Sequence, residues 1–169
     1  PIDFPDLLWL LEHSREVEFS ATTCFTFQDL DDRLEQQEPG KAITDTIRLH
    51  DVPAHHMTQL FRALSGVDHS ISTLDVATPY RIGIGMLRAL AKIVAQHPSI
   101  EKIRVSGLKR ADNSVFEFVM SVLECQNLVD VRCDFWGNAV PDQSTMSRTF
   151  KDYSKAMFDS IQQHPKLLY

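Results

Sequence analysis

The chain has 169 residues, enough to bury one sizeable core; 43% of them are hydrophobic and 24% charged, which excludes a disordered or collagen-like chain. Its formal net charge of −6 argues against nucleic acid as a general partner. The three cysteines, an odd number without a Cys-x-x-Cys spacing, indicate neither a disulfide framework nor a zinc ribbon and favour a reducing, cytoplasmic location.

The first predicted element is a helix that includes Phe4 and the apolar run Leu7–Leu11. This run is far shorter than a membrane span and is flanked by acidic residues rather than lysines, so we expect neither a signal peptide nor contact with a membrane. We expect the helix to belong to a preceding repeat or a cap, and residues 1–169 to be a single domain, excised from a longer protein.

Five short segments then share an internal repeat in which residues follow the order apolar-x-x-apolar-x-apolar. They start near residues 14, 44, 71, 100 and 128, at intervals of 27 to 30 residues. The alternation around the second and third apolar positions, where β-branched residues dominate, predicts a strand with one buried face. The segment at 14 is the weakest copy, and the one at 44 begins with a polar residue.

Amphipathic helices are predicted between the strands, because apolar residues recur there with the spacing of one helical face. Pro53 and the pair Asp112 and Asn113 mark helix starts, and a last helix is expected over 144–163 after an irregular insertion at 137–143. Strand–helix–strand units of this kind form parallel sheets through right-handed crossovers. The apolar positions are Met57, Leu60, Phe61 and Leu64; Leu87, Leu90, Ile93 and Val94; and Phe116, Val119, Met120 and Leu123.

The strand pattern with its following helix resembles the ribonuclease-inhibitor-like subfamily of leucine-rich repeat proteins, most clearly from Ile71 to Cys133. The resemblance implies an α/β solenoid, a right-handed superhelix with parallel strands on its concave face and helices on its convex face. The spacing is also similar to that of tropomodulin and of cytosolic immune-receptor repeats, and no residue pattern selects between them. Where the family places an Asn or Cys after each strand, this chain has Val52, Pro79, Leu108 and Trp136, so its turns must be satisfied in another way.

Three columns of residues are expected on the concave face: the third and fifth positions of each segment and the residue after the sixth. One interpretation is a lateral charge ladder that keeps the sheet soluble. The other is a binding surface on which Arg104 and Arg132, with Lys102 nearby, stay available for an acidic partner, partly offset by Asp130 and Asp134. The columns are Glu16, Thr46, Thr73, Lys102 and Asp130; Glu18, Arg48, Asp75, Arg104 and Arg132; and Ser20, His50, Ala77, Ser106 and Asp134.

Signals for other chemistry are weak. His50, Asp51, His55 and His56 form the only local histidine cluster, which we interpret as surface histidines around a turn rather than a metal site. Cys133 and Cys125 fall at core positions rather than nucleophile positions. Gly83 and Gly85 lack the pattern of a phosphate loop and are expected to be structural turn glycines.

We therefore expect a non-enzymatic scaffold for protein–protein interaction that binds a partner protein through the concave sheet face, without a metal, cofactor or small-molecule substrate. The alternative is the non-catalytic substrate-recognition domain of a larger enzyme or of a secreted effector. A standalone hydrolase is disfavoured because no acid–base pair or activated nucleophile stands out. The candidate protein-binding residues are Arg48, Asp75, Lys102, Arg104, Asp130, Arg132, Asp134 and Trp136.

Overall fold

The computed structural model describes residues 1–30, 32, 42–67, 69–78, 83–109, 113–136 and 148–167, with side chains omitted at 108–109, 113–115, 135–136 and 148–154. The predicted insertion at 137–143 and the predicted helix start at Asp112 lie outside these ranges.

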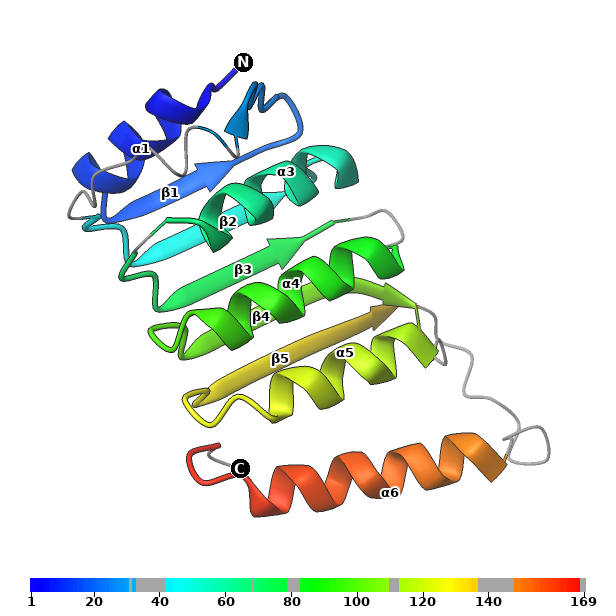
Figure 1. The fold of residues 1–169 in the computed structure, drawn as a ribbon. Helices are drawn as coiled ribbons and strands as arrows, with labels where there is room; N and C mark the ends of the chain where they lie inside the picture. The colour runs from blue at the N-terminus through cyan, green and yellow to red at the C-terminus, as the bar shows by residue number, and fades with distance from the viewer. Residues whose placement is uncertain are drawn as a thin grey trace.

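Helices and strands alternate along the described chain except at β1 and β2, which follow each other directly in the element order, and the five strands form one sheet (Figure 1). Neighbouring strands are all parallel, and their order across the sheet is their order in the chain. The predicted α/β class with a parallel sheet is therefore confirmed. The elements are α1 (Phe4–His13), β1 (Glu16–Phe19), β2 (Thr46–His50), α3 (Ala54–Ser65), β3 (Thr73–Ala77), α4 (Ile84–Gln96), β4 (Lys102–Lys109), α5 (Asn113–Leu123), β5 (Asp130–Trp136) and α6 (Arg148–Gln163).

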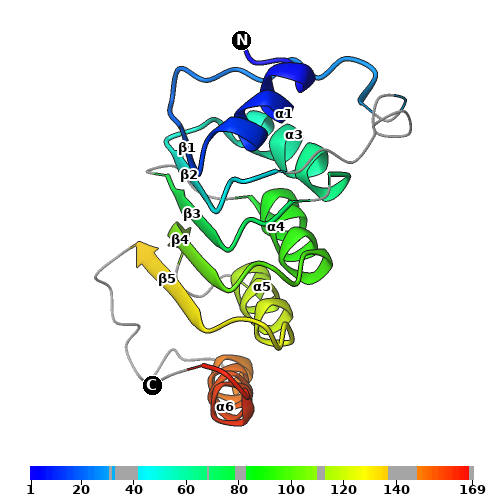
Figure 2. The same cartoon turned by 90° about the vertical axis from the view of Figure 1, so that its left-hand side faces the viewer.

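The elements form two layers, with the helices all on one face of the sheet (Figure 2). Along β1 to β4, buried apolar residues alternate with more exposed ones, as expected for a strand with one covered face, whereas Val131 and Cys133 on β5 are only half-buried. The buried strand residues and the apolar faces of the helices together make the core. All predicted core positions of α3 and α4 are buried: Met57, Leu60, Phe61 and Leu64, and Leu87, Leu90, Ile93 and Val94.

The predicted alignment is confirmed for the third and fifth positions of every segment, whereas the column after the sixth position pairs only at His50 with Ala77 and at Ser106 with Asp134. Thr73, for example, lies opposite Thr46 on one side and Lys102 on the other, so equal positions of successive copies are neighbours. At the start of each strand, one backbone carbonyl accepts the N–H groups of two consecutive residues in the next strand. Because these bonds recur at every step, they fix the register of the whole sheet. The accepting carbonyls belong to Arg15, Asp45, Ser72 and Glu101.

The two terminal helices lie where they are predicted. Helix α1 buries Phe4, Leu7 and Leu11. It starts after Asp3, whose carboxylate accepts the N–H of Asp6 at 2.9 Å and so caps the first turn. Helix α6 covers the predicted range 144–163 from residue 148 onward, and residues 144–147 are not described.

The predicted core face of α5 is wrong in part. Val119 and Leu123 are buried as predicted, but Phe116 and Met120 are only half-buried. Phe118 and Val122 complete the buried face instead. This helix is apolar around most of its circumference, so the spacing of its apolar residues admits two overlapping faces, and packing against its neighbours selects one.

Hydroxyl groups connect the turns that precede the strands. The buried Thr44 hydroxyl donates to the carbonyls of Leu11 at 3.0 Å and Ser14 at 2.6 Å. Ser70 likewise donates to the carbonyl of Ala42 at 3.1 Å, in the preceding repeat. Side-chain hydroxyls thus satisfy backbone carbonyls in the turns where strands begin, at the opposite end of the strands from Val52.

Imidazoles take part in the same turns. The Nδ1 atom of His69 accepts the N–H of Ile71 at 3.3 Å, and that of His164 accepts the N–H of Leu167 at 3.1 Å. The His69 ring also stacks on His97, with centroids 4.0 Å apart. Accepting at Nδ1 requires that this nitrogen carries no proton, so the tautomer of each ring is part of its turn.

One glycine has a backbone that other residues rarely adopt. Gly107 has a φ of 88°, and a Cβ atom at this position would collide with the carbonyl oxygen of Thr78. It coincides with the register shift between Ser106 and Leu108 in the pairing of β4 with β5. The sheet therefore needs glycine at this point.

Candidate protein-binding face

The side of the sheet away from the helices, here called the open face, carries the outward residues of all five strands (Figure 2). These side chains are exposed or half-buried, whereas their neighbours along each strand point into the core. The open face consists of Glu16 and Glu18 on β1; Thr46, Arg48 and His50 on β2; Thr73, Asp75 and Ala77 on β3; Lys102, Arg104 and Ser106 on β4; and Asp130, Arg132 and Asp134 on β5.

Seven of the eight candidate binding residues lie on the open face, in the predicted columns. The eighth, Trp136, pairs with Lys109 at the end of β5, and its side chain is outside the described part of the chain. The sheet therefore brings together residues that are up to 86 positions apart, from Arg48 to Asp134.

The predicted lateral charge ladder is wrong. Arg48 pairs diagonally with Glu16 of β1 instead of laterally with Glu18 or Asp75. The Nδ1 atom of His50 lies 3.4 Å from Glu18, a contact that becomes an ion pair only when the imidazole is protonated. Long side chains reach past the residue directly opposite, so the register of the backbone does not decide which charges meet.

The two arginines of β4 and β5 each contact one of the two acids that were expected to offset them in part. Arg104 contacts the carboxylate of Asp134 at 3.3 Å, and Arg132 contacts that of Asp130 at 2.9 Å. The hydrogen bonds to Asp130, and then its charge, raise the pKa of Arg132 above its usual value. The side chains of both pairs are substantially exposed, so water screens the two contacts and leaves them open to a competing partner.

Two charged residues of the open face have no such partner. Within the described ranges, neither Asp75 nor Lys102 forms an ion pair or a side-chain hydrogen bond. Lys102 stands beside Thr73 and Asp130 in the register, and Asp75 stands between Arg48 and Arg104. The middle of the open face thus presents one charge of each sign to solvent.

The histidine cluster does not assemble a ligand set. The Nδ1 atom of His56 accepts the N–H of Phe25 at 3.3 Å and lies 3.3 Å from Oε1 of Gln59, and its ring packs against that of His55. Among the described residues, no three His, Cys, Asp or Glu side chains are close enough to hold a metal ion.

The two cysteines at core positions have poorly ionised thiols. Burial, and then the charge of Asp134, raise the pKa of Cys133 to about 12. Burial, and then Glu124, also raise the pKa of Cys125, whose thiol donates to the carbonyl of Ser121 at 3.5 Å. Thiols in this state are weak nucleophiles.

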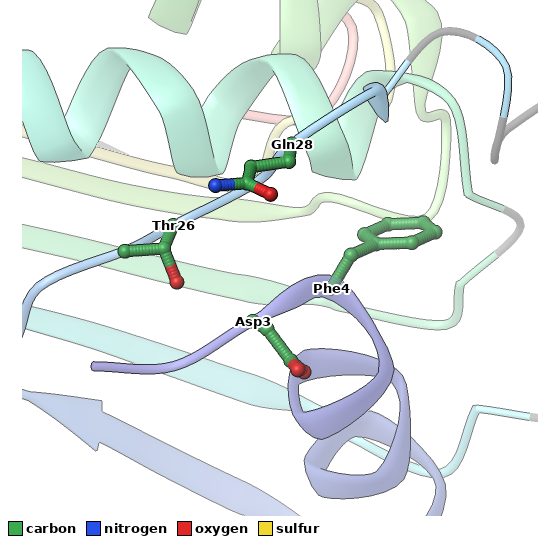
Figure 3. A pocket seen from close by; sticks show the side chains of 4 residues that line it. All are labelled: Asp3, Phe4, Thr26 and Gln28. Atoms are coloured by element: carbon green, nitrogen blue, oxygen red, sulfur yellow. The ribbon is translucent and has the colours of Figure 1, made fainter.

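A hollow of about 210 Å³ lies at the start of α1, lined by Asp3, Phe4, Thr26 and Gln28 (Figure 3). This volume is below the roughly 300–1,000 Å³ of sites for small molecules. Asp3 already caps α1, and Phe4 is buried in the core. The hollow therefore offers little free chemistry for a ligand.

Sequence reasoning missed the role of the turn residues Thr44, His69 and His164. A signal was present, because His97-Pro98 and His164-Pro165 recur before strand-like segments.

The two glycines expected in a turn differ in their outcome. Gly83 precedes α4 as its N-cap, but Gly85 lies inside the helix rather than in a turn.

No protein-family model, no curated protein and no solved structure matches this chain. None of the helices in the described ranges combines the length and the apolar character that crossing a bilayer requires.

Proposed function

We propose that the chain is a leucine-rich repeat solenoid of the ribonuclease-inhibitor-like type, and that it binds another protein through the open face without performing catalysis. The observation that carries this proposal is the one-sided covering of the sheet: helices α1, α3, α4 and α5 lie on the same face, and mostly polar residues line the opposite face.

The repeat supports the solenoid. Strand segments recur every 27 to 30 residues, each strand pairs with the next, and the same carbonyl bonds recur at each strand start. Helices are about 10 Å across and parallel strands about 4.8 Å apart, so a stack of such units curves with the sheet inside. The open face then becomes the concave wall, which is the usual binding surface of solenoids.

The composition of the open face supports a protein as the partner. It combines charges of both signs with small residues such as Thr46, Thr73 and Ala77, and a parallel sheet holds them in a fixed array. No described pocket offers a small molecule a comparable set of contacts. Three free cysteines are consistent with a cytoplasmic location.

Site-specific photo-crosslinking in the protein's own cells tests the proposal. A photoreactive amino acid replaces Thr73 on the open face or, as a matched control, the exposed Gln96 at the end of α4. We expect a discrete protein adduct from position 73 and none from position 96. Adducts from position 96 alone, or equally from both, would argue against the open face.

The captured protein is then purified and titrated against the Thr73→Trp and Gln96→Trp variants. Tryptophan is accommodated at a half-buried strand position of the open face and at an exposed helix end, so both variants should fold. We expect Thr73→Trp to weaken binding by at least about tenfold and Gln96→Trp to leave it unchanged. Equal affinities for the two variants would refute the proposal.

A further inference from the structure

Two arginines lie directly opposite each other on the open face. Arg104 of β4 is the register partner of Arg132 of β5, and neighbouring parallel strands are about 4.8 Å apart. The same column alternates in sign from Glu18 through Arg48 and Asp75 to Arg104, and only the last step places like charges side by side. Like charges in this position destabilise a sheet, so folding alone does not account for the pair.

The acids nearby only partly neutralise this region. Strands β4 and β5 present three cations to the open face, Lys102, Arg104 and Arg132, against the two carboxylates of Asp130 and Asp134. Strands β1 to β3 present one arginine, Arg48, against the three carboxylates of Glu16, Glu18 and Asp75. The open face therefore has a basic half and an acidic half.

The geometry of the ion pairs leaves donors available. Arg104 makes a single hydrogen bond of 3.3 Å in the described part of the chain, from one of its five N–H groups. Arg132 is held by Nε bonds of 3.1 and 3.2 Å to Asp130 on its own strand, which fixes the direction of its guanidinium. Lys102 has no acidic partner among the described residues.

We propose that the basic half of the open face, Lys102 with Arg104 and Arg132, binds the carboxylates of an acidic segment in the partner protein. One carboxylate placed between the two guanidiniums removes their repulsion and accepts charge-assisted hydrogen bonds from both, and a second one reaches Lys102. This inference rests on the proposed function and names the chemistry of its partner. Because the chain carries a net charge of −6, an acidic ligand gains no long-range attraction and depends on these three cations.

Fluorescence anisotropy with a labelled peptide of about eight residues, alternating glutamate and serine, tests the inference. The control peptide has glutamine in place of each glutamate. We expect the glutamate peptide to bind more tightly, with an affinity that falls as salt is raised, and the Arg104→Gln/Arg132→Gln variant to weaken binding by at least about tenfold. The matched variant Arg88→Gln/Lys92→Gln, which removes two exposed cations from α4, should bind like the unmodified chain.

Equal binding of the two peptides, or equal losses of peptide affinity in the two double variants, would overturn the inference. Displacement of the peptide by inorganic phosphate at an equal concentration would also overturn it, because it would indicate an adventitious anion site only. Failure here is distinguishable from failure of the proposed function. If the peptides show no preference while crosslinking from position 73 still captures a partner, the open face binds a protein of different chemistry.

Discussion

Acidification should weaken the fold through His69, which is 8% exposed and whose Nδ1 atom accepts the N–H of Ile71. Burial, and then the nearby His97, lower the pKa of His69 from 6.5 to about 4. As the pH falls below 6.5, the unfolded chain takes up the proton first, so folding becomes progressively less favourable. A pKa lowered from 6.5 to about 4 corresponds to a loss of about 3 kcal/mol in the free energy of unfolding, which is nearly absent above pH 6.5 and nearly complete at pH 4.

The variant His69→Asn isolates this contribution, because an asparagine carbonyl can accept the same N–H without titrating. Urea unfolding followed by circular dichroism gives the free energy of unfolding of both proteins at pH 7, 6, 5 and 4. We expect the unmodified chain to lose about 3 kcal/mol more than His69→Asn over this range. Contributions from groups distant from position 69 cancel in the difference, whereas the interaction of His69 with the stacked His97 is part of what the difference measures.

His13→Asn serves as the control, because His13 is an exposed histidine on α1. A difference between the unmodified chain and His69→Asn that stays constant from pH 7 to pH 4 would refute the reasoning. If His13→Asn changed the pH dependence of the free energy of unfolding as much as His69→Asn, the reasoning would also be refuted. The effect would then follow from the loss of any histidine rather than of a buried one.

Three further substitutions have expected outcomes in the same unfolding assay. Thr44→Val keeps the shape of the buried side chain but removes its two hydrogen bonds, and it should lower the free energy of unfolding by about 1–2 kcal/mol. An unchanged midpoint of urea unfolding would show that these bonds are dispensable. Gly107→Ala introduces a Cβ atom against the carbonyl of Thr78 at a positive φ and should cost about 1–3 kcal/mol; a stabilised variant would contradict the strain. Phe61→Ala in the core should cost about 3–5 kcal/mol, and Phe158→Ala, at a side chain that is 57% exposed, markedly less; equal losses would contradict the assigned core.

The strands and their register were predictable because the same signal occurs five times. A single apolar alternation such as that of 14–19 is weak evidence, but its copies at regular intervals assign each residue a column, and the observed partners follow those columns. The core face of α5 was not fully predictable, because a helix with apolar residues on most sides has no single direction of amphipathicity.

The ion pairs of the open face were not predictable from the columns. A register gives the residue directly opposite, but Arg48 and Arg104 extend beyond that residue and meet carboxylates on the diagonal. The hydrogen bonds of the turns were also hidden, since Thr44, His69 and His164 lie in segments whose conformation the apolar pattern does not specify. Only the recurrence of histidine before strand starts pointed to them.

The two faces of the sheet differ in how much stability they carry, and this difference makes the open face suitable for tests of function. The exposed ion pairs on it are screened by water and add little stability, whereas truncation of one core phenylalanine such as Phe61 costs about 3–5 kcal/mol. Replacing Arg104 and Arg132 also removes a repulsion between like charges, which offsets part of the loss of their aspartate contacts. Loss of binding in that double variant therefore reports on recognition rather than on unfolding.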